Sequence, residues 1–92
     1  MLANAAGLQE SQLAASGLDR KTIDLVKLAT LIALDAPPAA YSWQVSNALA
    51  HGATPEDILD VLIAVAPQVG GPRVISAAPE ILQALGIDVE DK

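Results

Sequence analysis

The stretch AAYSWQVSNALAHGATPEDILDVLIAVA, residues 39–66, predicts two helices joined by a tight turn. Gly52 can adopt the left-handed backbone conformation that ends a helix. Thr54 is a favourable N-cap, Pro55 suits the first helical position, and the two acidic residues that follow favour a first turn. The second helix is apolar on nearly all sides, so it needs packing partners in more than one direction. The stretch therefore predicts an all-α fold.

Outward from this turn, proline, glycine and aspartate mark the other helix boundaries. A helix with Asp19 as its N-cap is expected to run to about Leu34. The two prolines at positions 37 and 38 end that helix and start the next, because proline is tolerated in a first turn but not in a helix interior. Pro72 is expected to open a last helix that Gly86 closes.

The remaining segments complete a compact bundle of about five helices. A short helix is expected at 8–15, before a glycine, and the helix that follows Thr54 is expected to end at Ala66, before a Pro/Gly-rich cluster. Pro79 falls inside the last helix and predicts a kink or a split there. We interpret residues 1–92 as a single domain, in which 1–17 are an N-terminal extension and 87–92 a frayed tail.

Composition favours an assembly of several copies. The chain has 92 residues and is 52% hydrophobic, yet a chain this short buries only about two-thirds of its unfolded surface. A membrane span would need roughly 20 apolar residues, and charged residues interrupt every apolar run. We therefore expect a homo-oligomer, no membrane association, and a cytoplasmic location, since the N-terminus lacks the basic start and apolar core of a signal peptide.

Charge and residue types exclude several classes of function. The net charge is −6 and the five basic residues are scattered, so no basic stripe is available to neutralise nucleic-acid phosphates. There is no cysteine, which excludes disulfides, thiolate metal sites and thiol nucleophiles. Along the sequence the acidic residues are spread over helix starts and the tail, without the spacing of metal ligands beside the single histidine, so no metal is expected. No other cofactor is expected either.

Two segments resemble the carboxymuconolactone decarboxylase family, which includes the alkylhydroperoxidase D group. They are LDRKTIDLVKLATLIAL at 18–34 and ALAHGATPEDILDVLIAVAPQVGGPR at 48–73. The resemblance implies an all-helical subunit that assembles into trimers or hexamers. This expectation agrees with the apolar excess of the chain.

The same resemblance argues against redox chemistry. Redox members of the family use a Cys-x-x-Cys pair, a histidine four residues later and a glutamate on the preceding helix. The matching positions here are Pro37 and Ala40 for the cysteines, Gln44 for the histidine and Asp24 for the glutamate. Every redox residue is replaced, so peroxide reduction by a thiol pair is excluded.

Decarboxylase members act on a lactone acid, and this lyase-like reaction needs no thiol. It needs a proton donor or base and a cation for the carboxylate. His51 and Asp24 are the candidate catalytic residues. Gln44 cannot titrate but can position a ligand, Arg73 can hold a carboxylate bidentately, and Tyr41 shares the face of Gln44 and His51 as a pocket wall. The predicted ligand is a small carboxylate or lactone.

Each of these residues also has a purely structural explanation. His51 lies at the end of a helix, where the helix dipole favours a cation. Asp24 can pair with Lys27 on the same helix, and Arg73 can form a salt bridge between subunits. Tyr41 can pack at a subunit interface with its hydroxyl satisfied, and Gln44 can make an ordinary buried hydrogen bond. Trp43, on a different face, suits an interface or a core. Under this alternative the chain is a catalytically degenerate structural or ligand-binding homo-oligomer.

Overall fold

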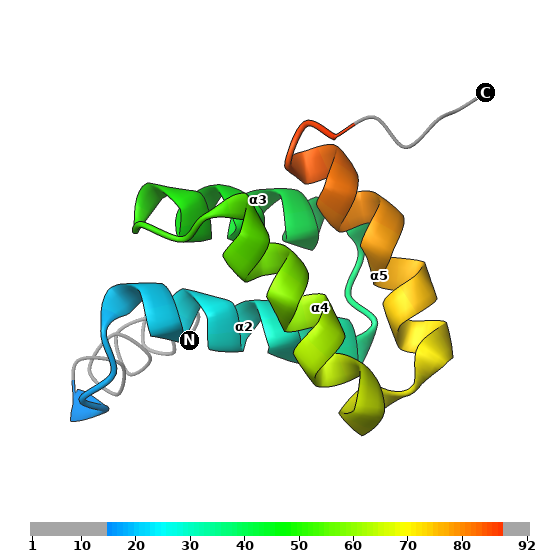
Figure 1. Ribbon diagram of the computed structural model, residues 1–92, viewed down its shortest axis with the longest axis horizontal. Coiled ribbons are helices and arrows are strands. Elements are labelled where there is room, and N and C mark those ends of the chain that lie inside the picture. The colour runs from blue at the N-terminus through cyan, green and yellow to red at the C-terminus, as the bar shows by residue number, and fades with distance from the viewer. Residues whose placement is uncertain (1–14, 88–92) are drawn as a thin grey trace, which may run out of the picture.

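A computed structural model describes residues 15–87 of the chain, and this part is all-α. It contains four helices, which are α2 (Arg20–Leu34), α3 (Pro38–Ala50), α4 (Pro55–Val69) and α5 (Gly71–Ala84) (Figure 1). The predicted fold class is confirmed, although the described range holds four helices rather than about five. The helix expected at 8–15 lies outside the described residues except for its last residue. None of these four helices is long and apolar enough to cross a membrane.

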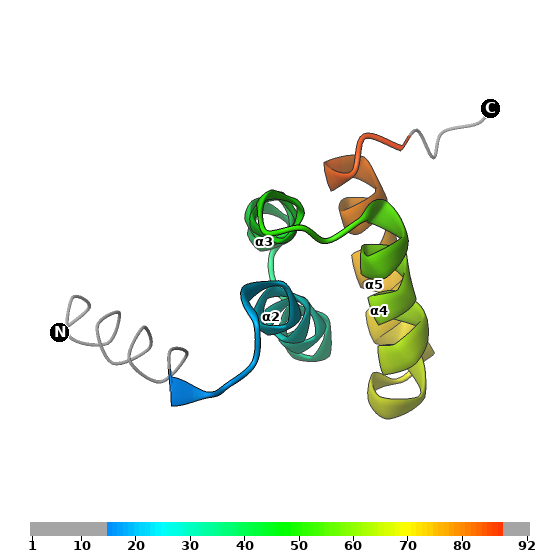
Figure 2. The same ribbon diagram turned by 60° about the vertical axis from the view of Figure 1, so that its left-hand side comes forward.

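The four helices pack as a four-sided bundle. α2 packs mainly against α3 and α4, and α5 packs mainly against the same two helices, so the order around the bundle is α2, α3, α5, α4. α2 and α5 contact each other less. Figure 2 shows α2 and α3 on one side and α4 and α5 on the other. The surface between α2 and α4 therefore lies opposite the surface between α3 and α5.

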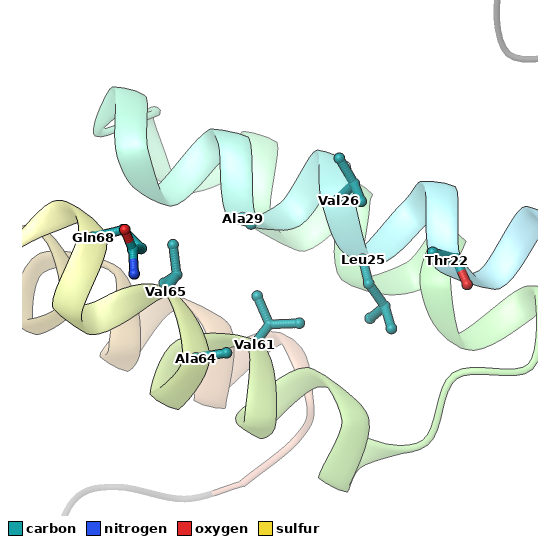
Figure 3. A pocket seen from close by; sticks show the side chains of 8 residues that line it. All are labelled: Thr22, Leu25, Val26, Ala29, Val61, Ala64, Val65 and Gln68. Carbon is teal, nitrogen blue, oxygen red and sulfur yellow. The ribbon is translucent and has the colours of Figure 1, made fainter. Parts of the chain in front are cut away.

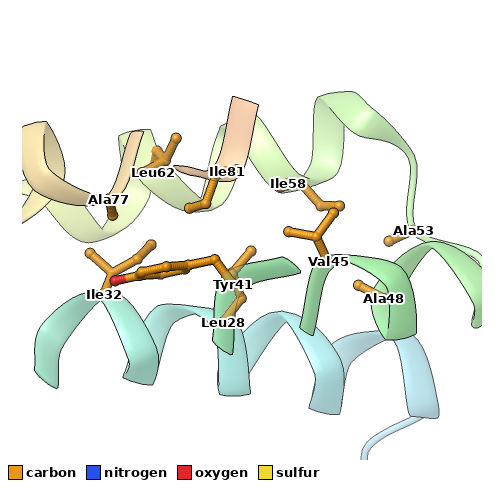
Figure 4. Packing of buried hydrophobic residues seen from close by; sticks show 10 residues of the cluster. All are labelled: Leu28, Ile32, Tyr41, Val45, Ala48, Ala53, Ile58, Leu62, Ala77 and Ile81. Atoms are coloured by element: carbon orange, nitrogen blue, oxygen red, sulfur yellow. The ribbon is translucent and has the colours of Figure 1, made fainter. Parts of the chain in front are cut away.

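A single hydrophobic cluster fills the centre and draws on all four helices (Figure 4). Its buried members are Leu28, Ile32, Tyr41, Val45, Ala48, Ala53, Ile58, Leu62, Ala77 and Ile81. Burying one branched aliphatic side chain contributes about 1.5–3 kcal/mol, so this cluster is the main source of stability. The small alanines allow α3 and α5 to approach their neighbours closely.

The predicted helix starts are confirmed by their hydrogen bonds. The carboxylate of Asp19 accepts a bond of 2.8 Å from the backbone N–H of Thr22, which makes Asp19 the N-cap of α2. Thr54 caps α4 through a reciprocal pair with Asp57, in which each side chain accepts a 3.0 Å bond from the other residue's backbone N–H. Such a capping box satisfies two N–H groups that the first turn leaves free.

The helix ends are also mostly as predicted. Gly52 has a φ of +100° after α3, and the next N–H, that of Ala53, donates a 3.0 Å bond back to Ala48. α2 ends at Leu34 as expected, but by a route the sequence did not indicate. Asp35 adopts the left-handed conformation, with φ 56° and ψ 54°, where glycine is usual.

The two interior prolines do not interrupt their helices. α4 runs through Pro67 to Val69, beyond its predicted end, and α5 runs through Pro79 without the predicted split. A proline leaves the carbonyl four residues earlier without its helical donor. Those earlier residues are Ile63 and Ile75, whose side chains are 71% and 73% exposed. Because both lie on the solvent side, water can satisfy the freed carbonyls, and each helix continues.

Candidate functional site

A buried carboxylate on α2 is the centre of the candidate site. The side chain of Asp24 is only 3% exposed, although a carboxylate is costly to bury without hydrogen-bond donors. The donor comes from the far end of α3, where Nδ1 of His51 lies 2.5 Å from Oδ2 of Asp24. His51 is the C-cap residue of α3, so the turn that ends this helix also places the imidazole.

Gln44 fastens α3 to the same residue of α2. Its Nε2 donates a 3.0 Å hydrogen bond to the backbone carbonyl of Asp24, and the residue is 4% exposed. Gln44 and His51 are seven residues apart, which places them on one face of a helix. Two side chains of α3 thus bind the carbonyl and the carboxylate of one residue, and within residues 15–87 no buried side-chain polar atom lacks a partner.

The imidazole of His51 connects this buried group to the surface. Its side chain is 35% exposed, whereas that of Asp24 is closed off from solvent. With Nδ1 engaged by the carboxylate, Nε2 is the nitrogen left to exchange a proton with solvent or a ligand. A carboxylate behind one ring nitrogen fixes the orientation of a histidine, which is an arrangement used in general acid–base catalysis.

Tyr41 is in the core rather than beside the imidazole. It is 2% exposed, and its hydroxyl donates a 3.1 Å hydrogen bond to the carbonyl of Leu31 on α2. Burial raises the pKa of the Tyr41 phenol, and the nearby carboxylate of Asp35 raises it further. In a single chain the hydroxyl of Tyr41 is already hydrogen-bonded to the backbone. Its predicted role in ligand binding stays a prediction.

Arg73 lies at the opposite end of α2. Its Nη1 is 3.5 Å from Oδ2 of Asp35, and the other carboxylate oxygen of Asp35 accepts a 3.1 Å hydrogen bond from Oγ of Ser76. Asp35 is eleven residues beyond Asp24, or about 16 Å along a helix. One chain therefore does not bring Arg73 to the imidazole, and its predicted binding of a carboxylate stays a prediction.

Comparison with known protein families shows which family the chain belongs to. The profile of the carboxymuconolactone decarboxylase family matches residues 1–84. The chain belongs to this family. Searches of curated proteins and of solved structures found no match.

Family membership relates the residues around Asp24 to the positions of the redox centre in other members. Matched by motif, Asp24 and Gln44 stand where redox members of the family carry a glutamate and a histidine, and here these two residues are hydrogen-bonded. Asp24 pairs with His51 rather than with Lys27, the alternative partner on its own helix. The sequence placed Gln44 and His51 on one helical face, but no local signal indicated that Asp35 would hold Arg73.

A second feature of this family member is an apolar groove between α2 and α4 (Figure 3). Its volume is about 350 Å³, and it is open to solvent. Its lining residues are Thr22, Leu25, Val26, Ala29, Val61, Ala64, Val65 and Gln68. None of them carries a charge, so the groove suits an apolar group and not a carboxylate.

Proposed function

We propose that the chain binds and converts a small carboxylate or lactone by cofactor-free acid–base chemistry, with His51 carrying the proton. The contact between Nδ1 of His51 and the buried carboxylate of Asp24 is the observation that supports this proposal. Asp24 orients the ring, and Gln44 holds Asp24 and the ring-bearing helix together. The family to which the chain belongs supplies the substrate class.

Decarboxylation of a lactone acid requires one proton and no redox partner. The bond between the ring carbon and the carboxylate breaks, and CO₂ leaves. The electron pair of that bond stays on the ring carbon. A new C–H bond then forms with a proton from Nε2 of His51, which solvent replaces. A positioned general acid of this kind contributes typically about 10²- to 10⁴-fold to a rate.

The test is a decarboxylation assay on a panel of small lactone acids, followed by ultraviolet absorbance and by CO₂ release. We expect turnover by the native chain and a loss of at least about 100-fold in His51→Gln. Ser46→Ala, on the exposed face of the same helix, is the matched control and should keep full activity. Turnover that survives His51→Gln would overturn the role of the histidine.

A catalytically inactive homo-oligomer is the second candidate. It is supported by large apolar side chains exposed on a single chain, among them Trp43 at 68% and Leu34 at 71%. In this case no lactone acid is turned over, and the protein forms a trimer or hexamer that binds ligands without converting them. A ligand-induced rise in melting temperature without CO₂ release would favour this candidate over the enzyme.

A further inference from the structure

Trp43 is the single tryptophan of the chain, and it faces solvent. It lies on α3 two residues after the buried Tyr41, about 200° further round the helix, so the indole points away from the core. The residue is 68% exposed. A few side chains usually dominate the binding energy of a protein interface, and tryptophan is one of the residue types most common among them.

The apolar groove between α2 and α4 is large enough to receive this side chain. Its volume of about 350 Å³ is more than twice the roughly 150 Å³ of an engineered apolar cavity that accepts benzene. Val61 and Val65 line it from α4, and Leu25 from α2 (Figure 3). Thr22 and Gln68 stand at opposite ends of the set and can bond the indole N–H.

The distribution of charge allows the occupant to be a second copy of the chain. Each copy carries a net charge of −6, so two copies repel each other over most of their surfaces. α3 contains no charged residue from Pro38 to Ala50, and none of the eight residues that line the groove is charged. These two surfaces can approach each other without bringing like charges together.

The order of the helices prevents Trp43 from reaching the groove of its own chain. The groove lies between α2 and α4, and the helix contacts place α3 at the corner of the bundle diagonal to α4. We propose that Trp43 of one copy inserts into the α2–α4 groove of the next copy. Such a contact joins two different surfaces, so it is heterologous, and repeating it closes a ring when the rotation allows.

This inference rests on the homo-oligomer proposed above and specifies its contact surfaces. Sedimentation of the native chain tests the assembly itself, and the emission of its only tryptophan tests the contact. We expect a blue-shifted emission maximum in the assembly and a red-shifted one after dilution to monomers. A native chain that is monomeric at every concentration would overturn both the assembly and the contact.

Two variants test the contact separately from the assembly. Trp43→Ala removes the inserted side chain, and Ala64→Glu places a charge in the groove at an exposed helical position that tolerates either residue. Each is expected to weaken assembly at least about 30-fold, as loss of a dominant interface residue does. Ile75→Ala is the matched control, because it removes an equally exposed apolar side chain from α5 and should assemble normally.

Mixing the two variants distinguishes this geometry from a symmetric one. Trp43→Ala keeps an intact groove and Ala64→Glu keeps an intact tryptophan, so the mixture should form one-to-one dimers with blue-shifted emission and nothing larger. If both surfaces paired with themselves, mixing would restore nothing. An assembly unaffected by either variant, or a mixture that stays monomeric, would overturn the proposed contact while leaving the oligomer intact.

Discussion

The two ends of α2 each carry an aspartate that pairs with a basic side chain from another part of the chain. At one end Asp24 is 3% exposed and contacts His51 at 2.5 Å. At the other end Asp35 is 49% exposed and lies 3.5 Å from Arg73. The residue types are nearly the same, but the surroundings differ, and the surroundings decide what each pair contributes.

Burial makes the Asp24 pair costly to disturb. Removing the partner of a buried charge leaves that charge with no compensation from water. At the Asp35 end, water replaces a lost partner, and exposed ion pairs contribute about 0–1 kcal/mol. A fixed, desolvated carboxylate can hold an imidazole for proton transfer, whereas the exposed pair serves mainly to join α5 to the end of α2.

The largest expected effect comes from removing the basic partner at the buried end. His51→Ala should lower the free energy of unfolding by about 2–3 kcal/mol, since it deletes a hydrogen bond to a charged group that is closed off from solvent. The same operation at the exposed end, Arg73→Ala, should cost no more than about 1 kcal/mol. Urea denaturation of the two variants side by side measures the difference.

The double variant shows where the cost of His51→Ala arises. If the unpaired charge of Asp24 is responsible, Asp24→Asn in the His51→Ala background should recover part of the loss, because an amide is cheaper to bury than a carboxylate. Equal stability losses in His51→Ala and Arg73→Ala would contradict the contrast between the two ends.

The sequence predicted the helices that carry these residues better than it predicted which side chains pair between helices. Helix starts at Asp19 and Thr54 and the stop at Gly52 depend on local chemistry, so they could be read from neighbouring residues. The helical repeat also placed Gln44 and His51 on one face. The position of Arg73 depends on how α5 packs against α2, which no local pattern encodes.

Other differences came from solvent exposure, which a sequence pattern does not report. Pro67 and Pro79 were expected to disrupt their helices, and both are tolerated because the carbonyls they leave free belong to residues on the solvent side. Likewise, the left-handed conformation at the end of α2 could not be predicted, because the residue that adopts it is Asp35 and not a glycine. The helical framework was therefore predictable, and the tertiary contacts that complete it were not.

An intermediate effect is expected at Tyr41, which lies in the core near the exposed end. Tyr41→Phe deletes the hydrogen bond to the carbonyl of Leu31 and should cost about 1 kcal/mol at neutral pH. Burial raises the pKa of this phenol in the folded state. The unfolded chain then releases the proton first, so the native protein should lose stability as the pH rises past about 10, the usual value for tyrosine.

Thermal melts of the native chain and Tyr41→Phe at neutral pH and above pH 10 check this sign. Tyr41 is the only tyrosine in the chain, so the variant removes the whole phenol contribution and leaves the lysines as a common background. The stability difference between the two proteins should shrink as the pH rises. A difference that stays constant across this range would show that the phenol titrates alike in the folded and unfolded chain.

The smallest effect is expected at Asp35, because losses and gains of stability oppose each other there. Asp35→Gly removes the exposed contacts to Arg73 and Ser76, worth about 0–1 kcal/mol, and gives the unfolded chain more freedom. It also relieves a left-handed conformation that costs a residue with a side chain about 1–2 kcal/mol. The net change should therefore lie within about 0.5 kcal/mol of zero. Asp35→Val loses the same contacts without this relief and should be clearly destabilised, because a β-branched residue resists positive φ. If urea denaturation found glycine as damaging as valine, relief of backbone strain at Asp35 would contribute little, and the side-chain contacts of Asp35 would decide the stability of the exposed end.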